Sequence, residues 1–132
     1  MSHDYSSHEY TLEFRSDHVV VQLAPNFELS PTILPAHWAA VLAFCKEHHC
    51  SKVLSLATNP RRTLKTIDAY DSGKAVASGG IALKVACYWQ GYEPDELTRF
   101  FQTVAANRGL EVEYFSSLSA ALTWLKVDTR AT

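Results

Sequence analysis

The sequence predicts one α/β domain in which four helices cover a mainly parallel β-sheet, with the order β-β-α-β-α-β-α-β-α. Three observations lead to this prediction. A chain of 132 residues with 47% hydrophobic residues fits a single domain with a real core. Segments with the two-residue period of strands alternate with segments whose apolar residues follow helical spacing. Two adjacent strands at the start form a hairpin, which adds an antiparallel edge to strands that right-handed crossovers connect.

The predicted hairpin consists of residues 10–15 and 18–23. The first segment alternates apolar and polar residues, as a half-buried strand does, and the second is rich in β-branched residues. Ser16 and Asp17 form the polar turn between them. Residues 1–8 are expected to be a loose tail and residues 128–132 another, which leaves residues 9–127 as the folded domain.

A first helix is expected to start near Pro35, because proline suits the first helical turn. The helix is expected to end near basic residues such as Lys46, because positive charges are stabilised by the negative end of the helix dipole. The run at residues 53–57 is apolar throughout and predicts a strand buried on both faces. The apolar stripe of the helix consists of Leu34, Trp38, Val41, Leu42 and Cys45.

A second helix is expected to begin at Asn59, as the N-cap, with Pro60 as its first residue, and to reach Ala77. A strand at residues 81–88 follows. A third helix begins at Pro94 and ends at Gly109, where glycine supplies a left-handed stop. Its first turn holds Asp95 and Glu96, and its apolar stripe consists of Leu97, Phe100, Phe101, Val104 and Ala105.

The last strand, residues 111–115, alternates again and is expected at a sheet edge. Ser116 or Ser117 then caps a final helix. The apolar stripe of this helix consists of Leu118, Ala121, Leu122 and Leu125, with Trp124 beside it.

The composition of the chain indicates its cellular compartment and excludes some classes of binding partner. The polar N-terminus lacks the apolar centre of a secretory signal, and no apolar run is long enough to cross a bilayer. We therefore expect a cytoplasmic protein, with Cys45, Cys50 and Cys87 as reduced thiols. Twelve basic and fourteen acidic residues give a net charge of −2, which provides no reason to expect nucleic acid as a partner.

A family resemblance depends on a few short segments. They are Phe101-Gln102-Thr103-Val104-Ala105-Ala106-Asn107-Arg108-Gly109, then Val112, Phe115, Ala121 and Trp124-Leu125, and also Asp68-Ala69-Tyr70 with Gly73. Together with the order of elements, they resemble the SpoIIAA-like branch of bacterial STAS domains, the fold of anti-sigma-factor antagonists. The resemblance covers residues from about 10 to 126. It implies a small non-enzymatic module that binds a protein partner, a second copy of itself or a ligand.

The sequence departs from this family at the site of its regulatory phosphorylation. In anti-sigma-factor antagonists, a phosphorylated serine lies at the start of the helix that follows the third strand. The matching stretch here, residues 57–63, holds no Asp-Ser pair, and Ser72 lies too far along the chain. A phosphate on Thr58 or Thr63 would be electrostatically favourable beside the basic residues that follow, so we consider these two residues candidate phosphoacceptors.

Basic residues near the predicted start of the second helix form a candidate anion site. The free backbone N–H groups at the start of a helix can bind an anion. Basic side chains at a helix start are disfavoured by the helix dipole unless an anion binds there. The ligand would be a small anionic metabolite or a lipid head group. Alternatively, these side chains point into water or pair with acidic residues such as Asp68. The residues of the candidate site are Asn59, Arg61, Arg62, Thr63 and Lys65.

Aromatic residues gather where the strand at residues 81–88 ends. Tyr88, Trp89 and Tyr92 are core residues, part of a pocket wall, or an exposed surface that contacts a partner.

Residue types suited to metal binding or catalysis do occur, but they do not assemble a site. Cys45, His48, His49 and Cys50 are of the metal-binding type, yet Cys45 is needed in the apolar stripe of the first helix. Cys87 ends a strand as a phosphatase nucleophile does, but no arginine follows in the adjoining loop. We therefore expect no metal, cofactor or enzymatic activity.

Two functions follow as the main hypotheses. The first is a STAS-like regulatory or scaffolding module that acts through protein–protein contacts. The alternative is a domain that binds a small anion or a lipid head group at the start of the second helix.

Overall fold

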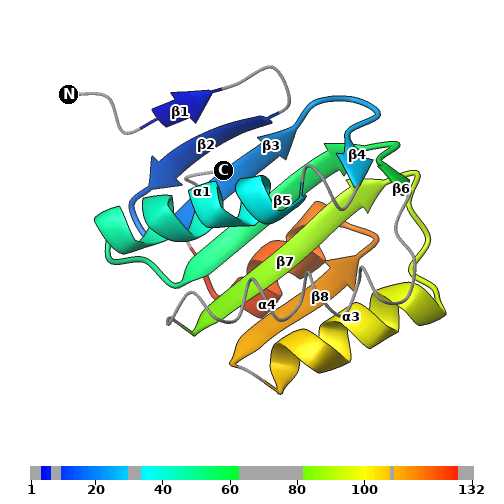
Figure 1. The fold of residues 1–132 in the computed structure, drawn as a ribbon. Coiled ribbons are helices and arrows are strands. Elements are labelled where there is room, and N and C mark those ends of the chain that lie inside the picture. The colour runs from blue at the N-terminus through cyan, green and yellow to red at the C-terminus, as the bar shows by residue number, and fades with distance from the viewer. Residues whose placement is uncertain (1–3, 7–9, 30–33, 63–81, 108, 128–132) are drawn as a thin grey trace.

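The computed structural model describes residues 4–6, 10–29, 34–62, 82–107 and 109–127. Within these residues, the chain forms an α/β structure around a mixed sheet, as the sequence predicts (Figure 1). The elements in chain order are β1 (Asp4–Ser6), β2 (Tyr10–Arg15), β3 (His18–Leu23), β4 (Glu28–Leu29), α1 (Leu34–Glu47), β5 (Lys52–Thr58), β6 (Arg61–Arg62), β7 (Leu83–Gln90), α3 (Glu96–Ala106), β8 (Leu110–Phe115) and α4 (Leu118–Leu125).

The main sheet has six strands in the order β1-β2-β3-β5-β7-β8. The β1–β2 and β2–β3 pairs are antiparallel, whereas β3, β5, β7 and β8 run parallel to one another. The predicted hairpin and the predicted parallel strands are therefore confirmed. Because parallel strands end on the same side, β3, β5, β7 and β8 all finish at one edge of the sheet, which we call the carboxyl edge. The strand ends at this edge are Leu23, Thr58, Gln90 and Phe115.

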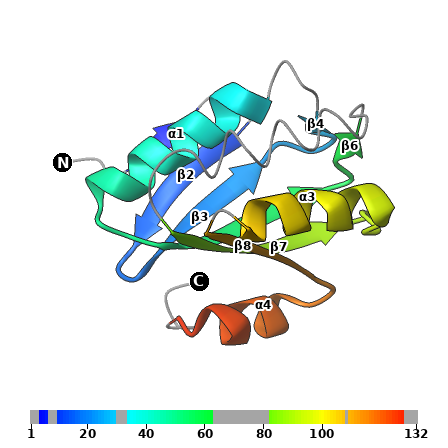
Figure 2. The ribbon, with the colours of Figure 1, turned by 60° about the horizontal axis from the view of Figure 1, so that its bottom comes forward.

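Helices cover both faces of the sheet (Figure 2). Helices α1 and α3 lie on one face, and α4 lies on the other. Side chains alternate between the two faces along each strand, so the central strands contribute to two separate cores. The core under α1 and α3 includes Leu12, Val19, Val21, Trp38, Val41, Cys45, Val53, Val85, Ala105, Leu110 and Val112. The core under α4 consists of Val20, Leu54, Ala86, Ala121, Leu122 and Leu125.

Two lysines of the sheet hold the end of α4. The ammonium group of Lys52 donates a hydrogen bond to the Lys126 carbonyl at 3.0 Å, and that of Lys84 donates one to the Trp124 carbonyl at 3.3 Å. The Lys84 ammonium also lies 4.4 Å from the centre of the Trp124 ring, in a cation–π contact. Cations stabilise the negative end of a helix dipole, so these contacts help to hold this short helix against its face of the sheet.

Several predicted helix ends are confirmed, and one changes by a residue. Ser117 is the N-cap of α4, and Gly109 has φ +92°, the left-handed stop expected after α3. Asp95 was expected within the first turn of α3 but is its N-cap, because its carboxylate accepts a hydrogen bond from the Thr98 N–H at 3.1 Å. The helix therefore begins at Glu96 rather than at Pro94.

The prediction of a helix that starts at Asn59 and Pro60 is wrong. Asn59 has φ +50°, whereas an N-cap residue has extended backbone angles. Arg61 and Arg62 form strand β6, which pairs in parallel with β4. The Arg61 N–H donates to the Phe27 carbonyl at 2.8 Å, so contacts with the chain after β3 hold this segment extended. The rest of the predicted helix, residues 63–77, lies outside the described residues.

The N-terminal tail was also predicted incorrectly in part. Asp4–Ser6 forms strand β1, which pairs antiparallel with β2 through Tyr5 and Leu12, among others. A segment of three residues is too short to carry a periodic signal in the sequence. None of the helices in the described part of the chain combines the length and apolar character needed to span a bilayer.

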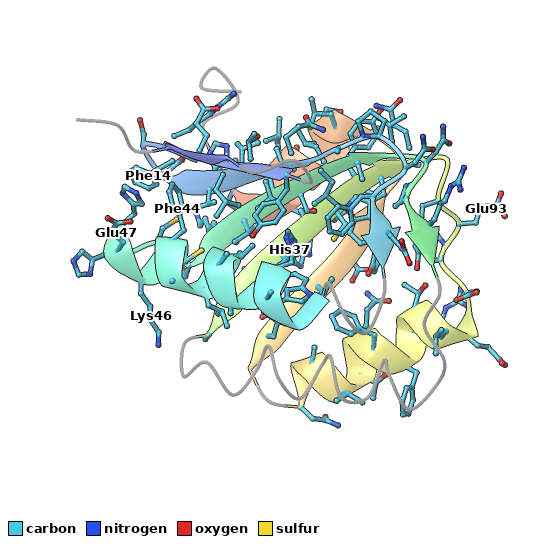
Figure 3. The ribbon with its side chains drawn as sticks, turned by 45° about the horizontal axis from the view of Figure 1, so that its top comes forward. Phe14, His37, Phe44, Lys46, Glu47 and Glu93 are labelled. Carbon is cyan, nitrogen blue, oxygen red and sulfur yellow. The ribbon has the colours of Figure 1, made fainter. Side chains whose placement is uncertain are left out.

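His37 is a buried histidine in the α1 core. It lies between α1 and the sheet (Figure 3), with only 5% of its surface exposed. Its ring lies 4.5 Å from that of Tyr10, 5.4 Å from that of Phe27 and 5.5 Å from that of Trp38, measured between ring centres. Within the described residues, its Nδ1 atom has no hydrogen-bond partner. Burial lowers the pKa of His37 from 6.5 to about 4, so the ring is neutral in the folded protein.

We predict that this histidine makes the fold less stable as the pH falls. Because the pKa is lower in the folded state, the unfolded chain binds the proton first, and stability is lost between about pH 6.5 and pH 4. Urea denaturation at pH 7.5 and pH 5.5 should show a loss of about 1 kcal/mol from this group. A His37→Phe variant should lose less stability over this range by that amount, whereas His49→Gln, at an exposed position, should behave like the natural chain. An equal loss in His37→Phe and the natural chain would contradict the assignment.

Candidate functional site

A pocket of about 380 Å³ opens at the carboxyl edge, where β7 and β8 end. We call it the edge pocket. It contains all three aromatic residues that the sequence singled out, and it adds two from β8 that were not predicted as site residues. The described residues that line it are Cys87, Tyr88, Trp89, Gln90, Gly91, Tyr92, Pro94, Tyr114, Phe115 and Ser116.

Strand alternation divides the aromatic residues of this pocket between the two faces of the sheet. Trp89 follows the alternation of Val85 and Cys87 and packs against the core under α1 and α3. Tyr88, one residue earlier, belongs to the opposite face, where its register partners are Leu56 on β5 and Phe115 on β8. The edge pocket therefore lies around the ends of β7 and β8 and is lined from both faces.

Trp89, Tyr92 and Tyr114 form one rigid group. The Trp89 ring meets the other two edge to face, with centres 5.1 Å and 5.3 Å away, and Tyr92 and Tyr114 stack at 5.7 Å. Hydrogen bonds hold two of these rings in place. The Trp89 indole N–H donates to the Ser55 hydroxyl at 3.0 Å, and the Tyr92 hydroxyl lies 2.7 Å from that of Thr98. The three residues therefore form part of the wall of the edge pocket and pack against the core under α1 and α3.

Tyr88 differs from these three rings. It is half-buried, yet within the described residues its ring makes no contact with another ring and its hydroxyl has no hydrogen-bond partner. The hydroxyl of a buried tyrosine usually has a hydrogen-bond partner. Because the Tyr88 hydroxyl has none among the described residues, it is available to solvent or to a ligand. The neighbouring Phe115 ring instead lies 5.6 Å from that of Trp124 on α4.

Gly91 joins the edge pocket to the loop after β5. Its φ of +78° is one that favours glycine, and a Cβ at this position would overlap the side-chain oxygen of Asn59. The Asn59 N–H also donates to the Gln90 carbonyl at 2.7 Å. The ends of β5 and β7 are therefore fixed to each other, and Asn59 serves as a packing residue at this edge.

The predicted anion site is brought together only in part. Asn59 and Arg61 lie at the carboxyl edge and are exposed, as is Thr58, the candidate phosphoacceptor. The side chain of Arg62 and all of Thr63 and Lys65 lie outside the description. Arg61 and Arg62 are in a strand, so they do not lie in the first turn of a helix, where the prediction placed them. Anion binding here stays a prediction, as does phosphorylation of Thr58 and Thr63.

The buried thiols are poorly suited to nucleophilic chemistry. Burial, with a smaller contribution from Glu113, raises the pKa of Cys87 far above its usual range. Burial and the nearby Cys50 raise the pKa of Cys45 to about 12. Both groups are therefore protonated at neutral pH, whereas a thiol nucleophile reacts as the thiolate. Among the residues that the structure describes, no three His, Cys, Asp or Glu side chains come together as a metal site.

Neither protein-family models nor curated proteins provide a match to this sequence. The site is therefore defined by its geometry. Sequence reasoning found Tyr88, Trp89 and Tyr92 because they adjoin one another at a strand end. It missed Tyr114 and Phe115, which follow the alternation of an edge strand and are brought to the pocket only by the β7–β8 pairing.

We predict that Ser55 and Trp89 are energetically coupled. Ser55 is 5% exposed, so Ser55→Ala removes the partner of the Trp89 indole N–H from a largely buried position and should lower the free energy of unfolding by about 1 kcal/mol. In a double-mutant cycle with Trp89→Phe, the Ser55→Ala change should cost less when the indole is absent. Equal costs in both backgrounds, measured by urea denaturation, would show that the hydrogen bond contributes nothing to stability.

Proposed function

We propose that this chain is a non-enzymatic, STAS-like regulatory or scaffolding module that acts through protein–protein contacts at the carboxyl edge. The observation that carries the proposal is Tyr88, a half-buried aromatic residue that lines a pocket, with no ring or hydroxyl partner among the described residues. Aromatic side chains of this kind dominate the binding energy of protein interfaces. A rigid ring group beside it, Trp89, Tyr92 and Tyr114, supplies a preformed surface.

The order of elements supports the STAS-like part of the proposal. A hairpin leads the chain, and β5, β7 and β8 follow as parallel strands with α1, α3 and α4 between or after them. We take this order as support for the STAS-like part of the proposal. The three cysteines are free thiols, which fits a reducing compartment such as the bacterial cytoplasm.

The partner contact can be tested with a photo-crosslinking amino acid placed in the chain inside its native cells. Position Gln90 is exposed and lines the edge pocket, whereas Glu47 is exposed at the end of α1, on the opposite side of the molecule (Figure 3). We expect a protein adduct of defined mass from position 90 and none from position 47. An adduct of twice the chain mass would identify the partner as a second copy of the chain.

The same experiment with Tyr88→Ala provides the control for specificity. Truncation of an aromatic anchor costs an interface more than about 1 kcal/mol, so the adduct at position 90 should fall by about tenfold. Phe100→Ala removes an exposed ring of α3 that does not line the edge pocket and should leave the adduct unchanged. No adduct at position 90, or an adduct insensitive to Tyr88→Ala, would count against a partner contact at this edge.

A further inference from the structure

We propose that the edge pocket binds a neutral, planar aromatic ring that carries one hydrogen-bonding group, of the phenol or indole class. This inference deepens the proposed function, on which it rests for its site, by naming the chemistry that the site recognises. Such a ring can belong to a free small molecule or to a tyrosine or tryptophan of the partner. The chemistry is the same in both cases.

The size of the pocket limits the ligand to one or two rings. Small-molecule sites typically measure roughly 300–1,000 Å³, and the edge pocket, at about 380 Å³, lies near the lower end. Five aromatic side chains line it, so an aromatic ligand would meet ring edges and faces on several sides. The aromatic residues are Tyr88, Trp89, Tyr92, Tyr114 and Phe115.

One wall of the pocket is organised before any ligand binds. Trp89 is held by Ser55, and Tyr92 by Thr98, whose hydroxyl in turn donates to Asp95 at 3.2 Å. Side chains that are already fixed lose little conformational entropy when a ligand arrives. This wall can therefore bind a rigid, flat group without rearranging.

On the opposite side of the pocket, Tyr88 has no partner among the described residues. Tyr88 and Phe115 are register partners on neighbouring strands, and such strands lie roughly 4.8 Å apart. No contact joins these two rings in the structure, and the Phe115 ring turns to Trp124 instead. Among the described residues, Tyr88 therefore has neither a ring contact nor a hydroxyl partner at the pocket, and a ring with a donor or acceptor would supply both.

The polar groups around the pocket indicate a neutral ligand. Among the described residues that line it, none carries an acidic or basic side chain. The uncharged polar side chains of the lining include the Tyr88 hydroxyl, the Gln90 amide and the Ser116 hydroxyl, which can donate or accept hydrogen bonds. An ionised carboxylate or phosphate would find no charged partner in this lining, whereas a phenol hydroxyl or an indole N–H would find hydrogen bonds.

The inference is tested by NMR titration of the full, ¹⁵N-labelled chain with p-cresol, indole and cyclohexanol. We expect saturable shifts of the Trp89 indole N–H and the Gly91 amide with p-cresol and indole. The Trp38 indole and the Gly109 amide, which do not line the pocket, should stay unchanged. Cyclohexanol carries a hydroxyl on a non-aromatic ring and should bind at least roughly threefold more weakly, since it lacks ring-to-ring contacts.

Variants then assign the binding to the pocket. Ser116→Phe, at an exposed loop position, should fill the pocket and abolish the shifts. Tyr88→Phe keeps the ring and removes the hydroxyl, so affinity should fall roughly threefold to tenfold. Phe100→Ala serves as the matched control and should bind as the natural chain does. Absence of saturable shifts in the natural chain, or shifts that persist in folded Ser116→Phe, would overturn the inference.

Two further measurements identify the source of the ring and separate this inference from the proposed function. Native mass spectrometry of the freshly purified chain shows a retained small molecule if the ring is a free ligand. If the ring belongs to the partner, indole should instead displace the crosslink formed at Gln90. A crosslink at Gln90 that persists with saturating indole, without a retained small molecule, would overturn the inference and leave the proposed function intact. Indole binding without any crosslink would support the pocket and overturn the proposed function.

Discussion

The structure depends on central strands whose two faces are both buried. Strand β7 places Val85 and Cys87 in the core under α1 and α3, and Ala86 in the core under α4. Burial on both faces leaves no freedom of register, because a shift by one residue would exchange the two sets of side chains. Lys52 and Lys84 reinforce this arrangement, since they extend from β5 and β7 to hold the end of α4.

This constraint explains the character of the carboxyl edge. Strand β7 keeps its alternation to its end, so Trp89 and Tyr88 point to opposite faces at the edge pocket. Trp89 finds Ser55, Tyr92 and Tyr114 and becomes part of the structure. Tyr88 lies on the face where α4 packs, but among the described residues no ring or hydroxyl meets it. At the end of β7, Tyr88 is therefore available to contact a ligand or a partner, while Trp89 beside it is held in place by its neighbours.

Most elements could be predicted because each carries a local signal. Alternation identified β2 and β8, and β-branched residues identified β3. Helical spacing identified α1 and α4, whose stripe residues Trp38, Val41, Ala121 and Leu122 are buried as expected. The prediction at Asn59–Pro60 is wrong because asparagine suits both a helix N-cap and the left-handed conformation that Asn59 has here. Only the pairing of β6 with β4 decides between them, and that pairing is a long-range interaction.

The site was predictable to a similar extent. The residues of one strand end, Tyr88 and Trp89, stand out in the sequence, but their division between two faces requires knowledge of which cores exist. Tyr114 and Phe115 reach the pocket through the β7–β8 register, which short-range periodicity does not contain. Among the described residues the Tyr88 hydroxyl has no partner, and this depends on the three-dimensional surroundings of Tyr88, which the sequence alone does not reveal.

The most direct measurement of this account is the order in which tyrosines are nitrated by tetranitromethane, followed by peptide mass spectrometry. Among the tyrosines with described side chains, Tyr10 is buried, and Tyr92 and Tyr114 are locked in the ring group with Trp89. Among these four tyrosines, we predict that Tyr88 is modified first in the folded protein and that this difference disappears in urea. Modification of Tyr92 or Tyr114 as early as Tyr88 would show that the strand end is not divided into a locked and an available side, and would contradict the account.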